Sequence, residues 1–96
     1  MQITMSKRKG TRNEHRTMRW LEAQGYACTR AAASLGLWDV IAIGPKDNRL
    51  CQVKTNRWPG SVEREQLEMF VCPPDTRKEI WRWDDYKKEP RVEVVR

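Results

Sequence analysis

The sequence predicts a small α/β domain, because helix-start signals alternate with short apolar runs in a chain of 96 residues. Thr11-Arg12-Asn13-Glu14 fits the S/T-x-x-E capping box that begins many helices. A turn-rich segment, residues 44–48, separates two apolar runs, which is typical of a β-hairpin. The expected order is helix, three strands, helix, two strands.

The boundaries of these elements follow from local signals. The first helix is expected over residues 11–24, because Gly25 suits a left-handed C-terminal cap. Ser61 is the expected N-cap of the second helix, with Glu63 and Glu65 placed favourably against the helix dipole, and Pro73 follows its end. The expected strands cover residues 26–30, 38–43, 49–55, 78–84 and 91–96.

Size and charge limit the function classes. The whole chain, residues 1–96, is expected to be one domain with a modest core, which favours a homodimer as added stabilisation. Nineteen Lys and Arg against thirteen Asp and Glu give a net charge of +6, and residues 1–10 are expected to form a basic N-terminal arm. This balance favours nucleic acid as partner, and a solvated basic surface is the alternative.

Cysteine usage and hydropathy bear on the compartment. Cys28, Cys51 and Cys72 are widely spaced and His15 is the single histidine, which argues against a disulfide framework and a structural zinc site. No run has the length of a membrane span. We therefore expect a cytoplasmic protein with no membrane partner.

The main candidate site lies on the predicted hairpin. Side chains alternate across a strand, so Asp39 is expected to share one sheet face with Gln52 and Lys54. A symmetric hairpin would set Ile41 opposite Gln52 and Asp39 opposite Lys54, although a slip of one residue would break this arrangement. Burying such polar groups on an apolar face is costly without a partner or a water-filled cleft.

Glu14 is expected to face the same site. It falls with Thr17, Met18 and Leu21 on the helical stripe that should contact the sheet. The alternative is that the capping box uses the Glu14 side chain locally, to accept a hydrogen bond from the Thr11 amide.

Together these groups form an oxygen-rich cluster of the kind that Mg²⁺ prefers, with one or two carboxylates and waters. Lys54 can then orient or deprotonate a water, or offset phosphate charge. The alternative for Asp39 and Lys54 is a cross-strand salt bridge, worth about 0.2 to 1 kcal/mol where exposed.

The ordered set of these residues resembles the PD-(D/E)XK nuclease superfamily, and within it the archaeal-type Holliday-junction resolvases and their phage relatives. The resemblance covers about the first half of the chain. It is carried by Lys9-Gly10-Thr11-Arg12-Asn13-Glu14, Gly25-Tyr26, Arg30-Ala31-Ala32-Ala33-Ser34, Trp38-Asp39-Val40-Ile41-Ala42 and Gln52-Val53-Lys54. It implies a restriction-endonuclease-like α/β core with a mixed central sheet flanked by helices, a homodimer, and Mg²⁺-dependent cleavage of branched DNA, with Mn²⁺ as a possible substitute.

The resemblance also assigns roles to single residues. Asp39 would be the principal metal ligand, Glu14 the helix carboxylate that completes the metal site, Lys54 the catalytic lysine, and Ser34 part of a loop that borders the site. Two residues depart from the family's motif, because Trp38 replaces a proline and Gln52 replaces an acidic residue. An amide oxygen can ligate Mg²⁺ but brings no charge, so we expect weaker metal binding.

DNA contacts are expected around the start of the first helix and in a basic loop before the second. Phosphate contacts at such residues would provide affinity without reading sequence. Trp58 can stack on an exposed base, pack across a dimer, or belong to the core. The expected DNA-binding residues are Lys7, Arg8, Lys9, Arg12, Arg16, Arg30, Arg57 and Trp58.

Three functions are compatible with these residues. The first is a structure-selective endonuclease that resolves Holliday junctions in recombination and repair. The second is a catalytically weak or inactive DNA-binding dimer of nuclease fold, motivated by Gln52. The third is a nuclease of the same fold that acts on other DNA.

Overall fold

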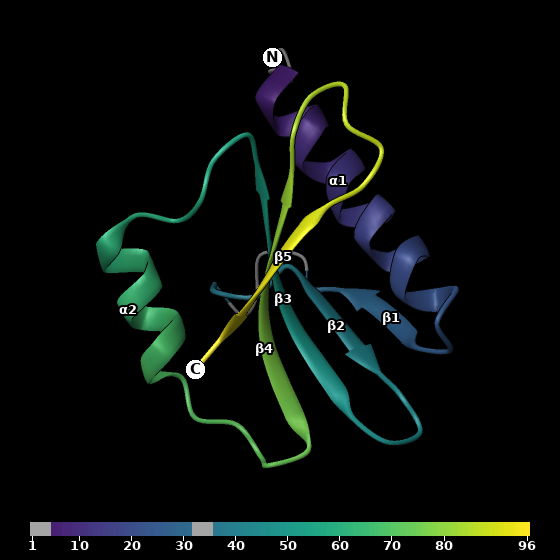
Figure 1. The fold of residues 1–96 in the computed structure, drawn as a ribbon, viewed down its shortest axis with the longest axis vertical. Coiled ribbons are helices and arrows are strands. Elements are labelled where there is room, and N and C mark those ends of the chain that lie inside the picture. The colour runs from purple at the N-terminus through teal and green to yellow at the C-terminus, as the bar shows by residue number, and fades with distance from the viewer. Residues whose placement is uncertain (1–4, 32–35) are drawn as a thin grey trace.

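The computed structural model describes residues 5–31 and 36–96, and it has the α/β fold that the sequence predicts (Figure 1). Its sheet is mixed, with strands in the order β1-β2-β3-β4-β5; β3 and β4 run parallel and the other neighbours run antiparallel. The elements are α1 (Met5–Glu22), β1 (Ala27–Arg30), β2 (Val40–Ile43), β3 (Asn48–Thr55), α2 (Ser61–Met69), β4 (Thr76–Trp83) and β5 (Arg91–Val95).

The two helices cover opposite faces of this sheet (Figure 1). Leu21 of α1 packs with one set of strand residues, Val40, Ala42, Cys51, Trp81 and Trp83. Leu67 of α2 packs with the alternate set, in which Ile80 and Val95 are buried and Leu50 is half-buried. Because consecutive side chains of a strand point to opposite faces, Cys51 and Leu50 belong to different cores.

Helix α1 begins at Met5, earlier than the expected range of 11–24, and ends at Glu22. Residues 5–10, which were expected in a basic arm, are therefore helical. Lys7, Arg8 and Lys9 are good helix formers, Gly10 costs only about 1 kcal/mol relative to alanine, and the ion pair from Lys9 to Asp85 (2.9 Å) ties the first turns down. The capping-box interpretation is wrong because Thr11 lies inside the helix, which leaves the Glu14 carboxylate available for other partners.

The β2–β3 hairpin pairs with a register two residues away from the expected one. Ile41 lies opposite Leu50 instead of Gln52, because the turn closes at Gly44, whose N–H donates to the Asp47 carbonyl oxygen (2.9 Å). A shift of two residues preserves the alternation of faces. Gln52 therefore keeps its expected face relative to Ile41. Asp39 precedes the first paired residue of β2, and its N–H donates to the Cys51 carbonyl oxygen, so the expected pairing of Asp39 with Lys54 is not formed.

Helix α2 is attached to the sheet at both ends. Gly60, in an extended conformation, occupies the N-cap position expected for Ser61, which is itself the first helical residue. At the other end the buried Lys78 of β4 donates to the carbonyl oxygens of Leu67, Glu68 and Phe70, at 2.7 to 2.8 Å. This ammonium binds carbonyls that a helix leaves without intrahelical partners.

The three cysteines are free, and Cys51 is buried in the core beneath α1. Among the described residues, neither helix combines the length and the apolar composition that crossing a bilayer requires.

Candidate functional site

Asp39 lies where β2 and β3 separate. Its own N–H still bonds to the Cys51 carbonyl oxygen (2.9 Å), but its carboxylate Oδ2 accepts a hydrogen bond from the Val53 N–H (2.8 Å). A side chain thus replaces the next backbone partner of β3. This bond fixes the orientation of the Asp39 carboxylate at the end of the hairpin ladder.

The surroundings of Asp39 disfavour its negative charge. Burial raises the pKa of Asp39 above its usual value, the Val53 N–H lowers it, the Glu14 carboxylate raises it, Lys54 lowers it and Glu63 raises it. Two further carboxylates are therefore close enough to act on Asp39. Like charges gathered in this way are relieved when a cation binds among them.

Gln52 is buried, with 3% of its surface exposed. Its Nε2 donates to the Leu37 carbonyl oxygen (3.3 Å) and to Oε2 of Glu63 (3.0 Å), whereas its Oε1 has no hydrogen-bond partner among the described residues. A buried acceptor without a partner costs about 1 to 3 kcal/mol. This oxygen therefore suits a cation or an ordered water as its partner.

Lys54 pairs with a residue other than the expected one. Its Nζ lies 2.7 Å from Oε1 of Glu63, in the first turn of α2, so the cross-strand salt bridge with Asp39 is replaced by a bridge to the helix. The sequence drew attention to Glu63 only as a helix-dipole residue. Its position in α2, a few residues after the loop that leaves Lys54, is the one sequence signal for its contact with the site.

Glu14 approaches from the α1 side. Its Oε1 accepts a hydrogen bond from Nε of Arg30 (3.0 Å), and this ion pair holds the carboxylate between α1 and β1. Glu14 is half-buried, and it belongs to the helix that covers the sheet face opposite the one on which Gln52 and Lys54 contact α2. Its negative charge is paired with the Arg30 guanidinium in this conformation.

The site therefore contains oxygen donors from several elements that do not yet converge. Within residues 5–31 and 36–96, no three His, Cys, Asp or Glu side chains form a group that could hold a metal ion. The available donors, carboxylates of Asp39, Glu14 and Glu63 with the Gln52 amide oxygen, are nevertheless the hard oxygen ligands that suit Mg²⁺. Ser34 lies outside the described residues.

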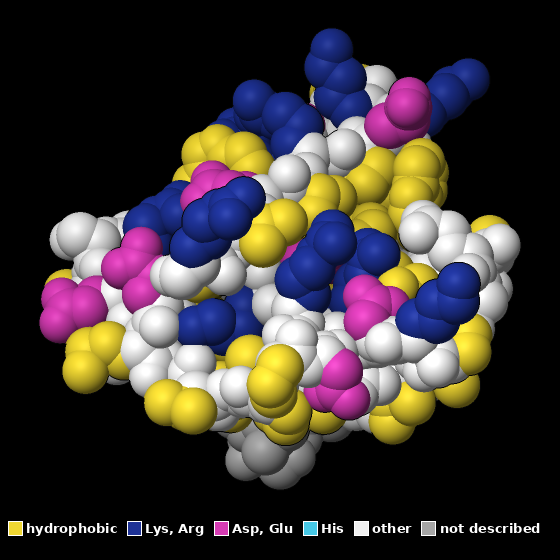
Figure 2. All heavy atoms as spheres, turned by 60° about the horizontal axis from the view of Figure 1, so that its bottom comes forward, with side chains coloured by type: hydrophobic (Ala, Val, Ile, Leu, Met, Phe, Trp, Pro, Cys, Tyr) yellow, Lys and Arg dark blue, Asp and Glu magenta, His cyan; other side chains and the backbone are white. Residues whose placement is uncertain are grey.

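A polar cavity of about 420 Å³ adjoins Lys54 at the end of β3. Lys9 and Arg57 line it together with Lys54, Thr55 and Asn56, so part of the expected basic surface borders the candidate site. Lys7 also lies in α1, and Arg8 and Arg12 are exposed on it. On the face that Figure 2 brings forward, basic side chains are interspersed with acidic and hydrophobic ones.

Two expected DNA-binding residues take part in packing. The Arg16 guanidinium lies 4.1 Å from the centre of the Trp83 ring and donates to the Lys87 carbonyl oxygen (3.1 Å). Trp58 is half-buried, packs against the core beneath α2, and has the guanidinium groups of Arg82 and Arg91 near its ring.

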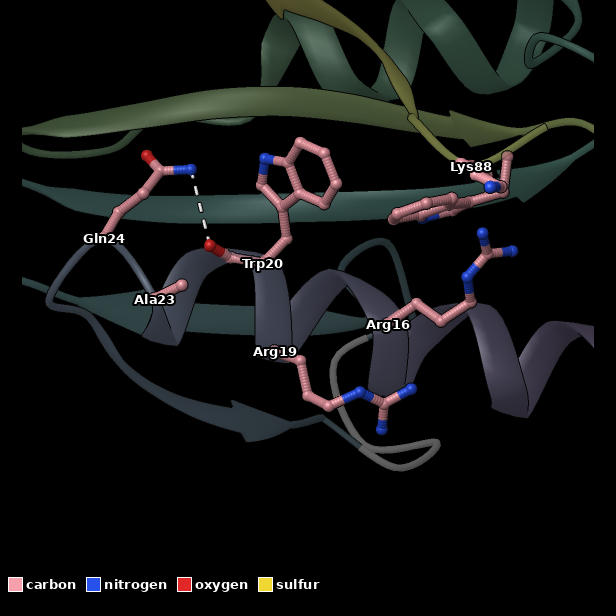
Figure 3. Close-up of a pocket in the computed structure, with 7 residues that line it drawn as sticks. Arg16, Arg19, Trp20, Ala23, Gln24 and Lys88 are labelled. Atoms are coloured by element: carbon pink, nitrogen blue, oxygen red, sulfur yellow. Dashed lines mark hydrogen bonds between the residues drawn. The ribbon is translucent and has the colours of Figure 1, made fainter.

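A separate hollow of about 550 Å³ lies between α1 and the loop that follows β4. In Figure 3 the Trp20 indole projects from α1 into it, Arg16 reaches in beside Lys88, and Gln24 donates to the Trp20 carbonyl oxygen. Trp20 and Trp83 meet there edge to face, with ring centres 6.0 Å apart. Asp39, Gln52 and Lys54 do not line this hollow.

Comparison with known proteins identifies the family of the chain. The family described as archaeal Holliday junction resolvase (Hjc) matches residues 5–72. Among solved structures, Hjc of Archaeoglobus fulgidus, a Holliday junction resolvase from an archaeal hyperthermophile, superposes with a TM-score of 0.72 at 23% sequence identity, covering 91% of this chain and 73% of the archaeal one. No curated protein matches the chain.

The mixed sheet, with an acidic residue and a lysine where two strands part, agrees with the PD-(D/E)XK nuclease class. Because the family match spans well over half of its length, the chain belongs to the archaeal Holliday junction resolvase (Hjc) family of that superfamily.

Proposed function

We propose that this chain is a metal-dependent, structure-selective DNA endonuclease that cleaves four-way junctions. The observation that carries the proposal is the Asp39 carboxylate, which is held by the N–H of Val53, the residue between Gln52 and Lys54 in β3, in a chain of the Hjc family. Membership of the family suggests junction resolution. The buried, oriented carboxylate and the neighbouring lysine suggest that the chemistry is phosphodiester hydrolysis.

The proposed metal ligands are Asp39, the Gln52 amide oxygen and Glu14, with Mg²⁺ or Mn²⁺ as the ion. Bound there, the ion would neutralise charge on the scissile phosphate and make a bound water more acidic. Asp39 is held in place by the Val53 N–H, so its carboxylate needs little reorganisation. Glu14 can bind the ion only if its ion pair with Arg30 opens. The Arg30 guanidinium would then be free to contact a DNA phosphate.

Lys54 would act on the phosphate or on the attacking water. Lys54 lines the polar cavity together with Lys9 and Arg57, so a DNA backbone in this cavity would pass three basic residues. Arg8 and Arg12 would extend the phosphate contacts along α1, and Ser34 would border the site. A homodimer would provide two such sites for paired nicks on opposite strands of a junction.

A comparison of DNA substrates tests this function. The protein is incubated with a four-way junction, a flap and a linear duplex, in Mg²⁺, in Mn²⁺ and in EDTA. We expect paired nicks in the junction with either metal and none in EDTA. Equal cleavage of linear duplex would contradict structure selectivity and favour a nuclease that acts on other DNA.

The second candidate is a DNA-binding dimer that has lost catalysis, and the neutral side chain of Gln52 is the observation that favours it. This candidate predicts junction binding that weakens steeply with salt and no cleavage with any divalent metal. The same incubations, analysed on native and denaturing gels, separate it from the endonuclease.

A further inference from the structure

Glu63 of α2 contacts two residues of the candidate site, Gln52 and Lys54. Its Oε1 lies 2.7 Å from Nζ of Lys54, and its Oε2 accepts a hydrogen bond from Nε2 of Gln52 (3.0 Å). Both contacts cross from α2 to β3. One carboxylate of the second helix thus contacts both the amide that replaces an acidic residue and the lysine two positions later.

The Gln52 side chain has one hydrogen-bonding atom, its amide oxygen, without a partner among the described residues. The residue is buried, with 3% of its surface exposed, and the amide that reaches Glu63 through nitrogen carries an oxygen with no partner among the described residues. If Gln52 served only to hold Glu63, a buried unpaired oxygen would remain as a cost of about 1 to 3 kcal/mol. A cation beside both groups would use that oxygen and the Glu63 charge together.

We propose that Glu63 is a metal ligand that supplies, from α2, the second negative charge that Gln52 lacks. Gln52 would then act as a neutral ligand and as a positioning residue, with its nitrogen turned toward Glu63 and its oxygen toward the cation. This inference rests on the proposed metal-dependent function and deepens it, because it names a donor outside the Asp39, Gln52 and Lys54 motif.

The ion pair between Glu63 and Lys54 gives this arrangement a second consequence. Without a cation the Glu63 carboxylate is neutralised by Lys54, and the Gln52 oxygen has no partner within residues 5–31 and 36–96. When Glu63 turns to a cation, the Lys54 ammonium loses its partner and becomes available to a DNA phosphate. Metal binding and the release of Lys54 are then coupled through one carboxylate.

Moving the charge between two positions tests the proposal. Binding of Mn²⁺ to metal-free protein is measured by electron paramagnetic resonance and by calorimetry, without DNA, for wild type, Glu63→Gln, Gln52→Glu and the double variant Gln52→Glu with Glu63→Gln. We expect Glu63→Gln to weaken Mn²⁺ binding roughly tenfold to a hundredfold. The double variant should recover most of that loss, because the carboxylate returns to β3.

Glu65→Gln is the matched control, because it removes the same charge from an exposed position of the same helix. It should bind Mn²⁺ like wild type. Unchanged Mn²⁺ affinity in Glu63→Gln, or no recovery in the double variant, would overturn the proposal. Thermal unfolding of each variant checks the fold.

Junction cleavage by the same proteins separates this proposal from the proposed function. A wild type that cleaves with metal while Glu63→Gln binds Mn²⁺ normally would leave the endonuclease in place and remove Glu63 from its metal site. If Mn²⁺ binding depends on Glu63 but the wild type never cleaves, Glu63 is supported as a metal ligand and the proposed endonuclease activity is contradicted. A wild type that binds no Mn²⁺ would overturn both.

Discussion

The folded surroundings of Asp39 disfavour the negative charge that its proposed role as a metal ligand requires. Burial and two neighbouring carboxylates raise the pKa of Asp39, even though the Val53 N–H and Lys54 favour its charge. A carboxyl group whose pKa is higher in the folded than in the unfolded protein makes its most favourable contribution to folding stability below the unfolded pKa, where it is neutral in both states. It loses that stabilisation as pH rises through the folded pKa, so its charge destabilises the fold at neutral pH.

We therefore predict that Asp39→Asn raises the free energy of unfolding of the metal-free protein at pH 7. An asparagine keeps an oxygen that can accept the Val53 N–H, and it carries no charge. The gain should shrink as pH falls toward and below the unfolded pKa of aspartate, about 4. Urea denaturation in EDTA across this pH range measures it, with Asp75→Asn at an exposed position as control. A variant less stable than wild type at pH 7 would contradict this account.

The proposed metal site is expected to attract a cation more or less strongly according to the charge at position 52. Replacing its amide with the carboxylate of Gln52→Glu adds a negative charge beside Asp39 and Glu63, so we predict tighter Mg²⁺ binding and half-maximal junction cleavage at a lower Mg²⁺ concentration. Gln66→Glu, which adds the same charge at an exposed position of α2, serves as control. Cleavage titrated against Mg²⁺ measures the effect, and an unchanged titration would mean that position 52 does not face the cation.

At the scale of elements, α2 depends on side chains at its two ends. Glu63 pairs with Lys54 at its start, Arg64 pairs with Glu93 of β5, and the Lys78 ammonium binds three carbonyl oxygens around its end. Leu67 is the buried residue of the helix. A helix with one buried side chain needs such polar attachments to keep Glu63 over β3.

We predict that Lys78→Met lowers the free energy of unfolding by about 2 kcal/mol, because hydrogen bonds to a buried charged group are worth roughly 1.5 to 3 kcal/mol. The exposed Lys46→Met should leave stability within about 0.5 kcal/mol of wild type. Urea denaturation of the two variants compares them directly. Equal stability would show that water replaces the ammonium at the end of α2 without loss.

The elements also show what the sequence could predict about the site. Strand alternation puts Gln52 and Lys54 on the one face that Glu63 contacts, and a register error of two residues does not change this. Asp39 precedes the first paired residue of β2, so its expected place on that face stays a prediction. The register itself depends on where the turn closes, which Asp47 decides through a backbone bond to Gly44 and a side-chain bond to Tyr26. Local residue patterns do not encode such a choice.

Contacts between elements were less predictable. The position of Glu63 depends on how α2 docks on the sheet, and that docking uses Lys78, far from Glu63 along the chain. Likewise, helix α1 extends back to Met5 because Lys9 reaches Asp85, a partner 76 residues away. The capping signal predicted a helix start at residue 11, whereas the contact between Lys9 and Asp85 favours the earlier start that the structure has.

At the scale of the whole molecule, positive residues divide into those that hold the fold and those that are exposed. Arg16 stacks on Trp83 and bonds to the Lys87 carbonyl oxygen, whereas Arg12, one turn earlier on α1, is exposed. The two arginines therefore form a natural pair of test positions. Net charge alone does not separate these roles.

We predict that Arg16→Ala lowers the free energy of unfolding by about 1 to 2 kcal/mol through loss of the Trp83 contact and a charged hydrogen bond. Arg12→Ala should leave stability unchanged, weaken junction binding, and reduce the salt dependence of binding by about one phosphate contact. Urea denaturation and binding titrations at several salt concentrations, in EDTA, measure both effects. An Arg12→Ala variant with the binding of wild type would remove this residue from the DNA surface.

We propose that Asp39 organises a metal-dependent site for junction cleavage in this member of the Hjc family. The most direct test of this proposal measures the bound and the nicked fractions of a labelled four-way junction for wild type and Asp39→Asn in Mg²⁺. We expect both proteins to bind the junction and only wild type to introduce paired nicks. Nicking by Asp39→Asn at the rate of wild type would contradict it.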